Sequence, residues 1–118
     1  MRYHVKELER TPEQIRYSLE FPPTSRFFEG HFPDNPILPG VAQVLICTEL
    51  LAASLAQPVS VRELETVRFR KPLTPSTPCE LTVRLPDADG RIEFAFRSEE
   101  GLVADGKMLI TIGEGFDG

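Results

Sequence analysis

Residues 28 to 41 read FEGHFPDNPILPGV, and residues 40 to 55 continue as GVAQVLICTELLAASL. In the first stretch Gly30 precedes His31 and three prolines follow it. Proline rings restrict the backbone, so we expect an ordered loop that holds the imidazole in place. The second stretch has the length and composition of a helix that begins at Gly40 and ends before Pro58. It is apolar on nearly every face, which predicts a buried helix.

Short segments of alternating apolar and polar residues lie on both sides of this helix. They predict two strands before it, at residues 2–8 and 15–21, and about four antiparallel strands after it. The later strands are expected at residues 67–70, 81–85 and 92–96 and in a last segment that runs to about Ile112. Asp87 to Gly90 has the composition of a tight hairpin turn. This order predicts an α+β fold in which one curved antiparallel sheet wraps a central helix.

Length, charge and cysteine content limit the classes of protein to consider. The chain of 118 residues predicts a single domain over residues 1–118, with a loose tail at residues 113–118. The net charge of -5 argues against nucleic-acid binding, because that function needs a basic face. No stretch is apolar enough for a signal peptide or a membrane span, so we expect a cytoplasmic protein. Cys47 and Cys79 lack metal or redox spacing, which predicts two buried thiols and no metal site.

His31 and Gly40 together suggest a site that forms an enolate. The N–H groups at the start of a helix favour negative charge on a carbonyl oxygen. A histidine, with a pKa near neutrality, can remove the proton next to that carbonyl. The alternative is that His31 is a polar surface residue, the commoner role of a lone loop histidine.

The motif around these residues resembles the signature of the FabZ/FabA dehydratases, the 3-hydroxyacyl-carrier-protein dehydratase family. The resemblance covers roughly residues 13 to 112. The positions that carry it are Gly30 to Pro33, Pro36, Pro39 to Val41, Gln43, residues 67–73 and Pro75.

This resemblance implies a hotdog fold and an obligate dimer, or a trimer of dimers, with active sites at the dimer interface. The implied substrate is a 3-hydroxyacyl chain on acyl carrier protein, which loses water to give the trans-2-enoyl thioester without a metal or organic cofactor. His31 matches the histidine that removes the C2 proton, and Gly40 matches the glycine whose amide binds the thioester carbonyl. We place Phe32, Val41 and Leu45 beside them as substrate-binding residues.

The sequence departs from the family at position 45. The family has a glutamate or aspartate there, supplied by the other protomer, whereas this chain has Leu45, which cannot transfer a proton. Glu49 is one turn further on, about 6 Å along the axis at ~1.5 Å per residue. Glu49 is therefore either a replacement acid or a half-buried interface carboxylate paired with an arginine. Asp34 is another candidate acid, although an aspartate in this context more often caps a turn.

Three basic residues, Arg68, Arg70 and Lys71, follow one another along an expected strand and the bend after it. They form either a solvated strand face or a docking patch for an acidic carrier protein.

Three functions therefore compete. The first is a dehydratase in fatty-acid, polyene or polyketide-type biosynthesis that uses a different acid. The second is a non-catalytic or half-site subunit of a heteromeric dehydratase, whose partner, a paralogue of this chain, supplies the missing acid. The third is a hotdog acyl thioesterase, although enzymes of that kind also need a carboxylate to activate water.

Overall fold

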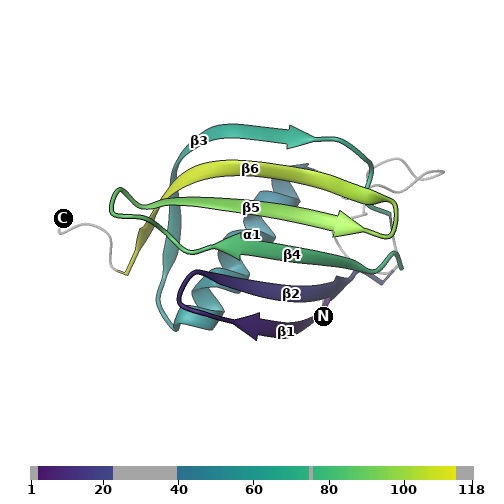
Figure 1. The fold of residues 1–118 in the computed structure, drawn as a ribbon, viewed down its shortest axis with the longest axis horizontal. Coiled ribbons are helices and arrows are strands. Elements are labelled where there is room, and N and C mark those ends of the chain that lie inside the picture. Colours follow the sequence, from purple (N-terminus) through teal and green to yellow (C-terminus); the bar gives the residue numbers. More distant parts are fainter. Residues whose placement is uncertain (1–2, 23–39, 75, 114–118) are drawn as a thin grey trace.

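The computed structural model describes residues 3–22, 40–74 and 76–113, which form one sheet lying across one helix (Figure 1). The helix α1 spans Gly40–Leu55. The strands are β1 (His4–Arg10), β2 (Gln14–Glu20), β3 (Val59–Phe69), β4 (Cys79–Arg84), β5 (Arg91–Ser98) and β6 (Gly101–Ile112). Their order across the sheet is β1-β2-β4-β5-β6-β3, and each neighbouring pair is antiparallel.

The core lies between α1 and one face of the sheet. Strands β2, β4 and β5 alternate buried with more exposed side chains, the pattern of a sheet with one solvated face. Leu81 and Phe96 are fully buried from the sheet side, and Ile46 and Leu51 from the helix side. The prediction of one helix wrapped by one antiparallel sheet is confirmed.

The helix has the predicted ends, but not the predicted burial. It begins at Gly40 and ends at Leu55, after which Ala56 adopts a positive φ of 55° and Pro58 follows. The prediction of a helix buried on every face is wrong for the single chain. Val41 is 78% exposed and Leu45 is 48% exposed, because only one side of α1 packs on the sheet.

Strand β3 is longer than its sequence pattern predicts. It begins at Val59 instead of residue 67, and it lies at the edge of the sheet, where β6 is its only partner among the described strands. Its register against β6 shifts between Val61 and Glu63 and again between Leu64 and Thr66. Each irregularity moves the apolar residues to a different phase of the two-residue repeat, so the alternation that reveals a strand is lost.

At the other edge, β1 begins and ends two residues later than the predicted range of 2–8. Its first predicted residue lies outside the described part of the chain. Its side chains are exposed along its whole length, and within the part of the chain that the structure describes it pairs only with β2. The sheet thus has two solvated edge strands, β1 and β3.

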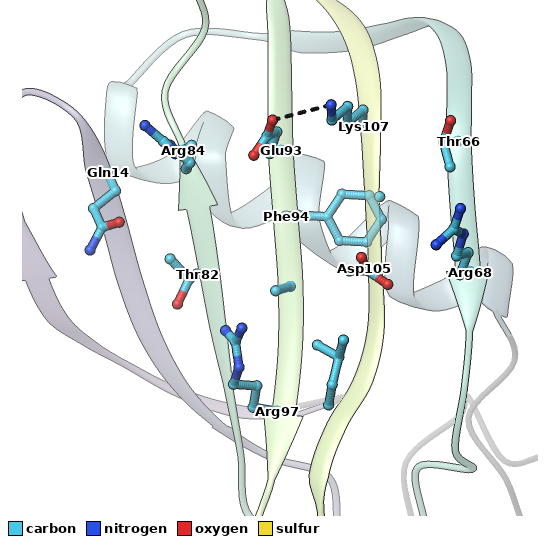
Figure 2. A pocket seen from close by; sticks show the side chains of 13 residues that line it. Gln14, Thr66, Arg68, Thr82, Arg84, Glu93, Phe94, Arg97, Asp105 and Lys107 are labelled. Carbon is cyan, nitrogen blue, oxygen red and sulfur yellow. Dashed lines mark ion pairs between the residues drawn. The ribbon is translucent and has the colours of Figure 1, made fainter.

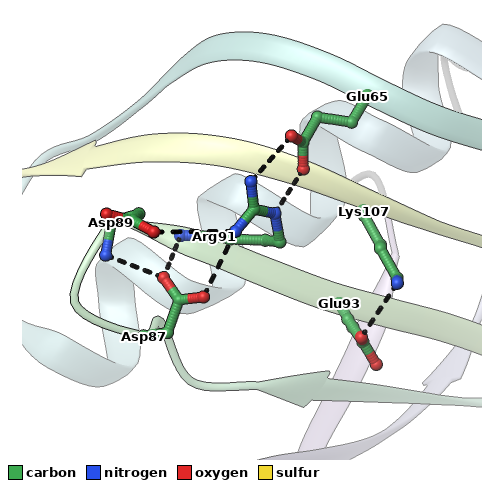
Figure 3. Close-up of polar contacts among 6 residues, drawn as sticks. All are labelled: Glu65, Asp87, Asp89, Arg91, Glu93 and Lys107. Carbon is green, nitrogen blue, oxygen red and sulfur yellow. Dashed lines mark hydrogen bonds and ion pairs between the residues drawn. The ribbon is translucent and has the colours of Figure 1, made fainter.

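The predicted turn at Asp87 to Gly90 connects β4 to β5. The Asp87 carboxylate accepts hydrogen bonds from the backbone N–H groups of Asp89 and Arg91, at 2.8 and 3.1 Å, and Gly90 has a φ of 87°. The Arg91 guanidinium also donates to both carboxylate oxygens of Glu65, at 2.6 and 2.9 Å. Figure 3 shows how this network fastens the hairpin to the edge strand β3.

Both cysteines are free and buried, as predicted. Burial raises the pKa of the Cys47 thiol and of the Cys79 thiol to about 12, so both are neutral at physiological pH. Within the described residues, no cluster of three or more histidine, cysteine or acidic side chains could hold a metal ion. In the same residues, no helix is long and apolar enough to cross a membrane.

Candidate active site at the start of the helix

The start of α1 meets the end of β3 in a very close contact. A Cβ added at Gly40 would lie 2.6 Å from Cζ of Phe69 and 2.8 and 3.0 Å from two further carbons of that ring. A residue with a side chain would therefore displace the ring. This contact joins the two segments that carry the family resemblance, the loop motif that ends at Val41 and the strand motif that begins at Val67.

The first turn of α1 leaves backbone N–H groups without partners inside the helix. It contains no acidic side chain. The partial positive charge at this end of the helix is therefore not offset by a carboxylate of the same turn, and the amides can stabilise a negatively charged oxygen. This arrangement suits the predicted role of Gly40 in binding a thioester carbonyl.

The predicted base and its neighbours lie outside the described residues. This applies to His31, to Phe32 and to Asp34. Their roles stay predictions.

Along α1, the residues at four-residue intervals from Val41 share one face. Val41 and Leu45 are exposed, and Glu49 is half-buried one turn beyond them. The Glu49 carboxylate accepts a hydrogen bond of 3.0 Å from the Tyr3 hydroxyl, and the Tyr3 ring packs against Phe21 with centroids 5.7 Å apart. The hydrogen bond between Tyr3 and Glu49, which are 46 residues apart in the chain, was not predicted from the sequence. The pairing of Glu49 with an arginine stays a prediction.

The predicted basic cluster is not a uniform patch. The Arg70 guanidinium donates to Asp105 at 3.0 Å, and the Lys71 ammonium donates to the backbone carbonyl of Glu100. Arg68 forms no ion pair or side-chain hydrogen bond with the described residues. Instead it lines a hollow of about 550 Å³ on the outer face of the sheet, together with Arg84 and Arg97 (Figure 2).

Sequence reasoning missed Arg84 and Arg97 as neighbours of Arg68. Each stands at an outward position of its own strand, which the alternation of residues did indicate. Which outward residues become neighbours depends on strand order and register, and neither of these was known from the sequence.

One helix wrapped by a curved antiparallel sheet of six strands defines a hotdog-fold protein. Comparison with known proteins identifies a family within this fold class. The family model described as ApeI-like, ApeI dehydratase, matches residues 7–107. The chain belongs to this family of hotdog dehydratases.

Individual relatives agree with this assignment. The 3-hydroxyacyl-[acyl-carrier-protein] dehydratase FabZ of Syntrophobacter fumaroxidans is 31% identical over 117 residues, covering 90% of this chain and 80% of that protein. A chain of the dehydratase heterocomplex ApeI:P from Xenorhabdus doucetiae superimposes with a TM-score of 0.79 at 27% identity, covering 91% of this chain and 93% of that chain.

A hypothetical thioesterase of Streptococcus pneumoniae has a TM-score of 0.70, with coverage of 96% and 93%. Its identity to this chain is only 9%, so it shows the shared fold alone.

Proposed function

We propose that this chain takes part in removing water from a 3-hydroxyacyl thioester on acyl carrier protein, in fatty-acid, polyene or polyketide-type biosynthesis. His31 takes the proton from C2, and the electron pair of that C–H bond forms the C2=C3 double bond. The C3–O bond breaks, and the hydroxyl leaves as water with a proton supplied by an acid, which is either Glu49 or a helix carboxylate of a paralogous partner. The amide of Gly40 stabilises the negative charge that develops on the thioester oxygen.

The observation that supports this proposal most directly is the structure at the start of α1, in a chain that belongs to the dehydratase family. The helix begins at Gly40, Phe69 packs against that residue, and no carboxylate stands in the first turn to oppose an oxyanion. The role of His31 is supported by its motif, and the choice of substrate by the FabZ relative. Val41, exposed beside Gly40, is expected to contact the acyl chain with Phe32.

The absence of a carboxylate at position 45 supports a second candidate function. Leu45 and Val41 form an exposed apolar stripe where the family has a carboxylate from the other protomer. A subunit that has the histidine but not the acid can complete a site with a paralogue that supplies it. The structural relative from Xenorhabdus doucetiae is itself part of a heterocomplex, which supports this half-site role.

Both candidate functions involve assembly into at least a dimer. Strand β3 is a sheet edge with exposed Leu64, and an unpaired edge offers backbone groups to a second strand. The exposed Val41 and Leu45 add an apolar surface on the helix. A second protomer, identical or paralogous, would cover both, and such dimers can associate further into a trimer of dimers.

Glu49 is the alternative source of the proton. Its carboxylate already accepts the hydrogen bond from Tyr3, and it is displaced by about 6 Å along the helix from position 45. Proton transfer needs hydrogen-bond reach, so Glu49 can act only if the acyl chain binds further along the helix than in the family.

Carrier-protein docking has less support at the predicted cluster than the sequence suggested. Arg70 and Lys71 are both engaged within the chain, which leaves Arg68 as the cation available to an acidic partner.

The test is to incubate the purified chain with short and long 3-hydroxyacyl carrier-protein substrates and to follow the loss of water by mass spectrometry. We expect water loss that falls by about 100-fold or more in His31→Ala. An unchanged rate in Glu49→Gln would remove Glu49 as the acid. Water loss only after addition of a paralogue with the helix carboxylate would select the half-site role. No water loss under either condition would refute both.

A further inference from the structure

The hollow on the outer face of the sheet has a simple structural cause. Strand register places Thr82, Ala95, Asp105 and Arg68 side by side in one row across β4, β5, β6 and β3. Thr82 and Ala95, which are neighbours in this row, have short side chains. Longer side chains flank them on β4 and β5, with Arg84 and Glu93 in the row on one side and Arg97 in the row on the other. The surface is therefore recessed over Ala95.

The charge of this hollow is opposite to that of the chain. Arg68, Arg84 and Arg97 form no ion pair or side-chain hydrogen bond with the described residues, although the whole chain has a net charge of -5. The two acidic residues of the hollow already have cationic partners. Asp105 lies 3.0 Å from Arg70, and Glu93 lies 3.6 Å from Lys107.

These features specify the class of ligand. Guanidinium groups bind phosphate through paired N–H donors, and the hydroxyls of Thr66 and Thr82 add donors in the same hollow. In the strand register Arg84 stands opposite Glu93, which is four residues from Arg97 on β5. The two arginines are therefore separated by about 13 Å along the strand direction. Arginines at this spacing can bind separate phosphate groups or converge on a diphosphate. In Figure 2 the side chain of Arg97 extends toward Thr82.

We propose that this hollow binds a small organic ligand that carries two or more phosphate groups. Its volume of about 550 Å³ falls within the range of small-molecule sites, roughly 300 to 1,000 Å³. The recess at Ala95 favours a small ligand over a protein surface, because a protein partner would have to insert a protruding side chain between the arginines. Since α1 lies on the opposite side of the sheet (Figure 2), the site is separate from the proposed active site and goes beyond the proposed function.

The experiment measures binding of ADP, coenzyme A and inorganic pyrophosphate to the intact protein by isothermal titration calorimetry. We expect saturable binding of ADP or coenzyme A that weakens by about 10-fold or more in Arg97→Gln and in Arg84→Gln. Ala95→Met keeps every charge but fills the recess, and it should abolish binding. Ala95→Ser keeps the recess open and should bind like the wild type, which controls for the change at this position.

Arg62→Gln is the matched charge control, because Arg62 is on β3 but does not line the hollow. Equal weakening in Arg62→Gln and Arg97→Gln would mean that general electrostatic attraction alone holds the ligand, and it would overturn the proposal. Unchanged binding in Ala95→Met, or no saturable binding of any of the three probes, would also overturn it. Binding of acidic carrier protein that depends on Arg84 and Arg97, without binding of the small phosphates, would replace the proposed site with a protein-docking surface.

Discussion

At the residue scale, Gly40 shows why a motif glycine can be required by packing as well as by chemistry. Its family role concerns its amide, but in this chain the missing side chain also leaves room for the ring of Phe69. The sequence indicated both residues, one in each half of the resemblance. It did not indicate their contact, because 28 residues and a turn of the chain separate them.

Substituting Gly40 by alanine therefore tests this contact. The new Cβ would lie within 3.0 Å of three ring carbons of Phe69, and the ring, which is 51% exposed, must swing toward solvent. We expect a loss of about 1 kcal/mol in the free energy of unfolding. In a Phe69→Ala background the same substitution should be neutral or stabilising, because alanine favours a helix over glycine.

Urea denaturation of the four variants in this double-mutant cycle gives the coupling energy. Equal effects of Gly40→Ala in both backgrounds would show that the ring does not resist the Cβ.

At the element scale, the strands differ in how well their sequences predict them. β2, β4 and β5 were predictable because each has one buried face and an unbroken two-residue repeat. β3 was only partly predictable, since it is an exposed edge strand whose register shifts twice. The hairpin between β4 and β5 was predictable from Asp87 and Gly90, but its attachment to β3 through Arg91 and Glu65 depends on tertiary structure.

This attachment predicts a pH dependence of stability. The hydrogen bonds from Arg91 hold the pKa of Glu65 below its usual range, and backbone hydrogen bonds from Arg91 and Asp89 lower the pKa of Asp87. A carboxylate whose pKa is lower in the folded state stabilises the fold above its unfolded pKa, about 4. That contribution is lost as the pH falls through the folded pKa.

The urea midpoint of the wild type should therefore fall as the pH is lowered from about 5 to about 3. In Arg91→Gln the fall should be shallower, because Glu65 then loses the partner that depresses its pKa, while Asp87 keeps its bond to the backbone of Asp89. Arg62→Gln, on the same strand as Glu65 but outside the network, should follow the wild type. Parallel curves for wild type and Arg91→Gln would show that the ion pair adds nothing to the acid dependence.

At the scale of the whole molecule, the helix α1 leaves apolar side chains exposed on one side of the single chain. The sequence predicted a helix buried all round, and the apolar composition that suggested this is still present in Val41 and Leu45. Their exposure in the single chain is consistent with burial by a second protomer. Composition alone cannot distinguish a face covered by the chain itself from one covered by a partner, so the expectation of a dimer interface here depended on the family resemblance.

The position of Leu45 allows the shared site to be tested in one step. If a second protomer places its residue 45 beside the substrate, Leu45→Glu puts an acid into each site of a homodimer. Because Leu45 is 48% exposed in the single chain, a glutamate there does not disturb the core of the protomer. We expect water loss from the 3-hydroxyacyl substrate to rise by about 100-fold or more, the usual contribution of general acid catalysis.

The control is Leu45→Gln, whose side chain has nearly the same shape as that of glutamate but cannot supply a proton. Its rate should match that of the wild type. A glutamate variant that stays folded and dimeric but is no faster than the glutamine variant would show that position 45 does not face the substrate, and the search for the acid would return to Glu49.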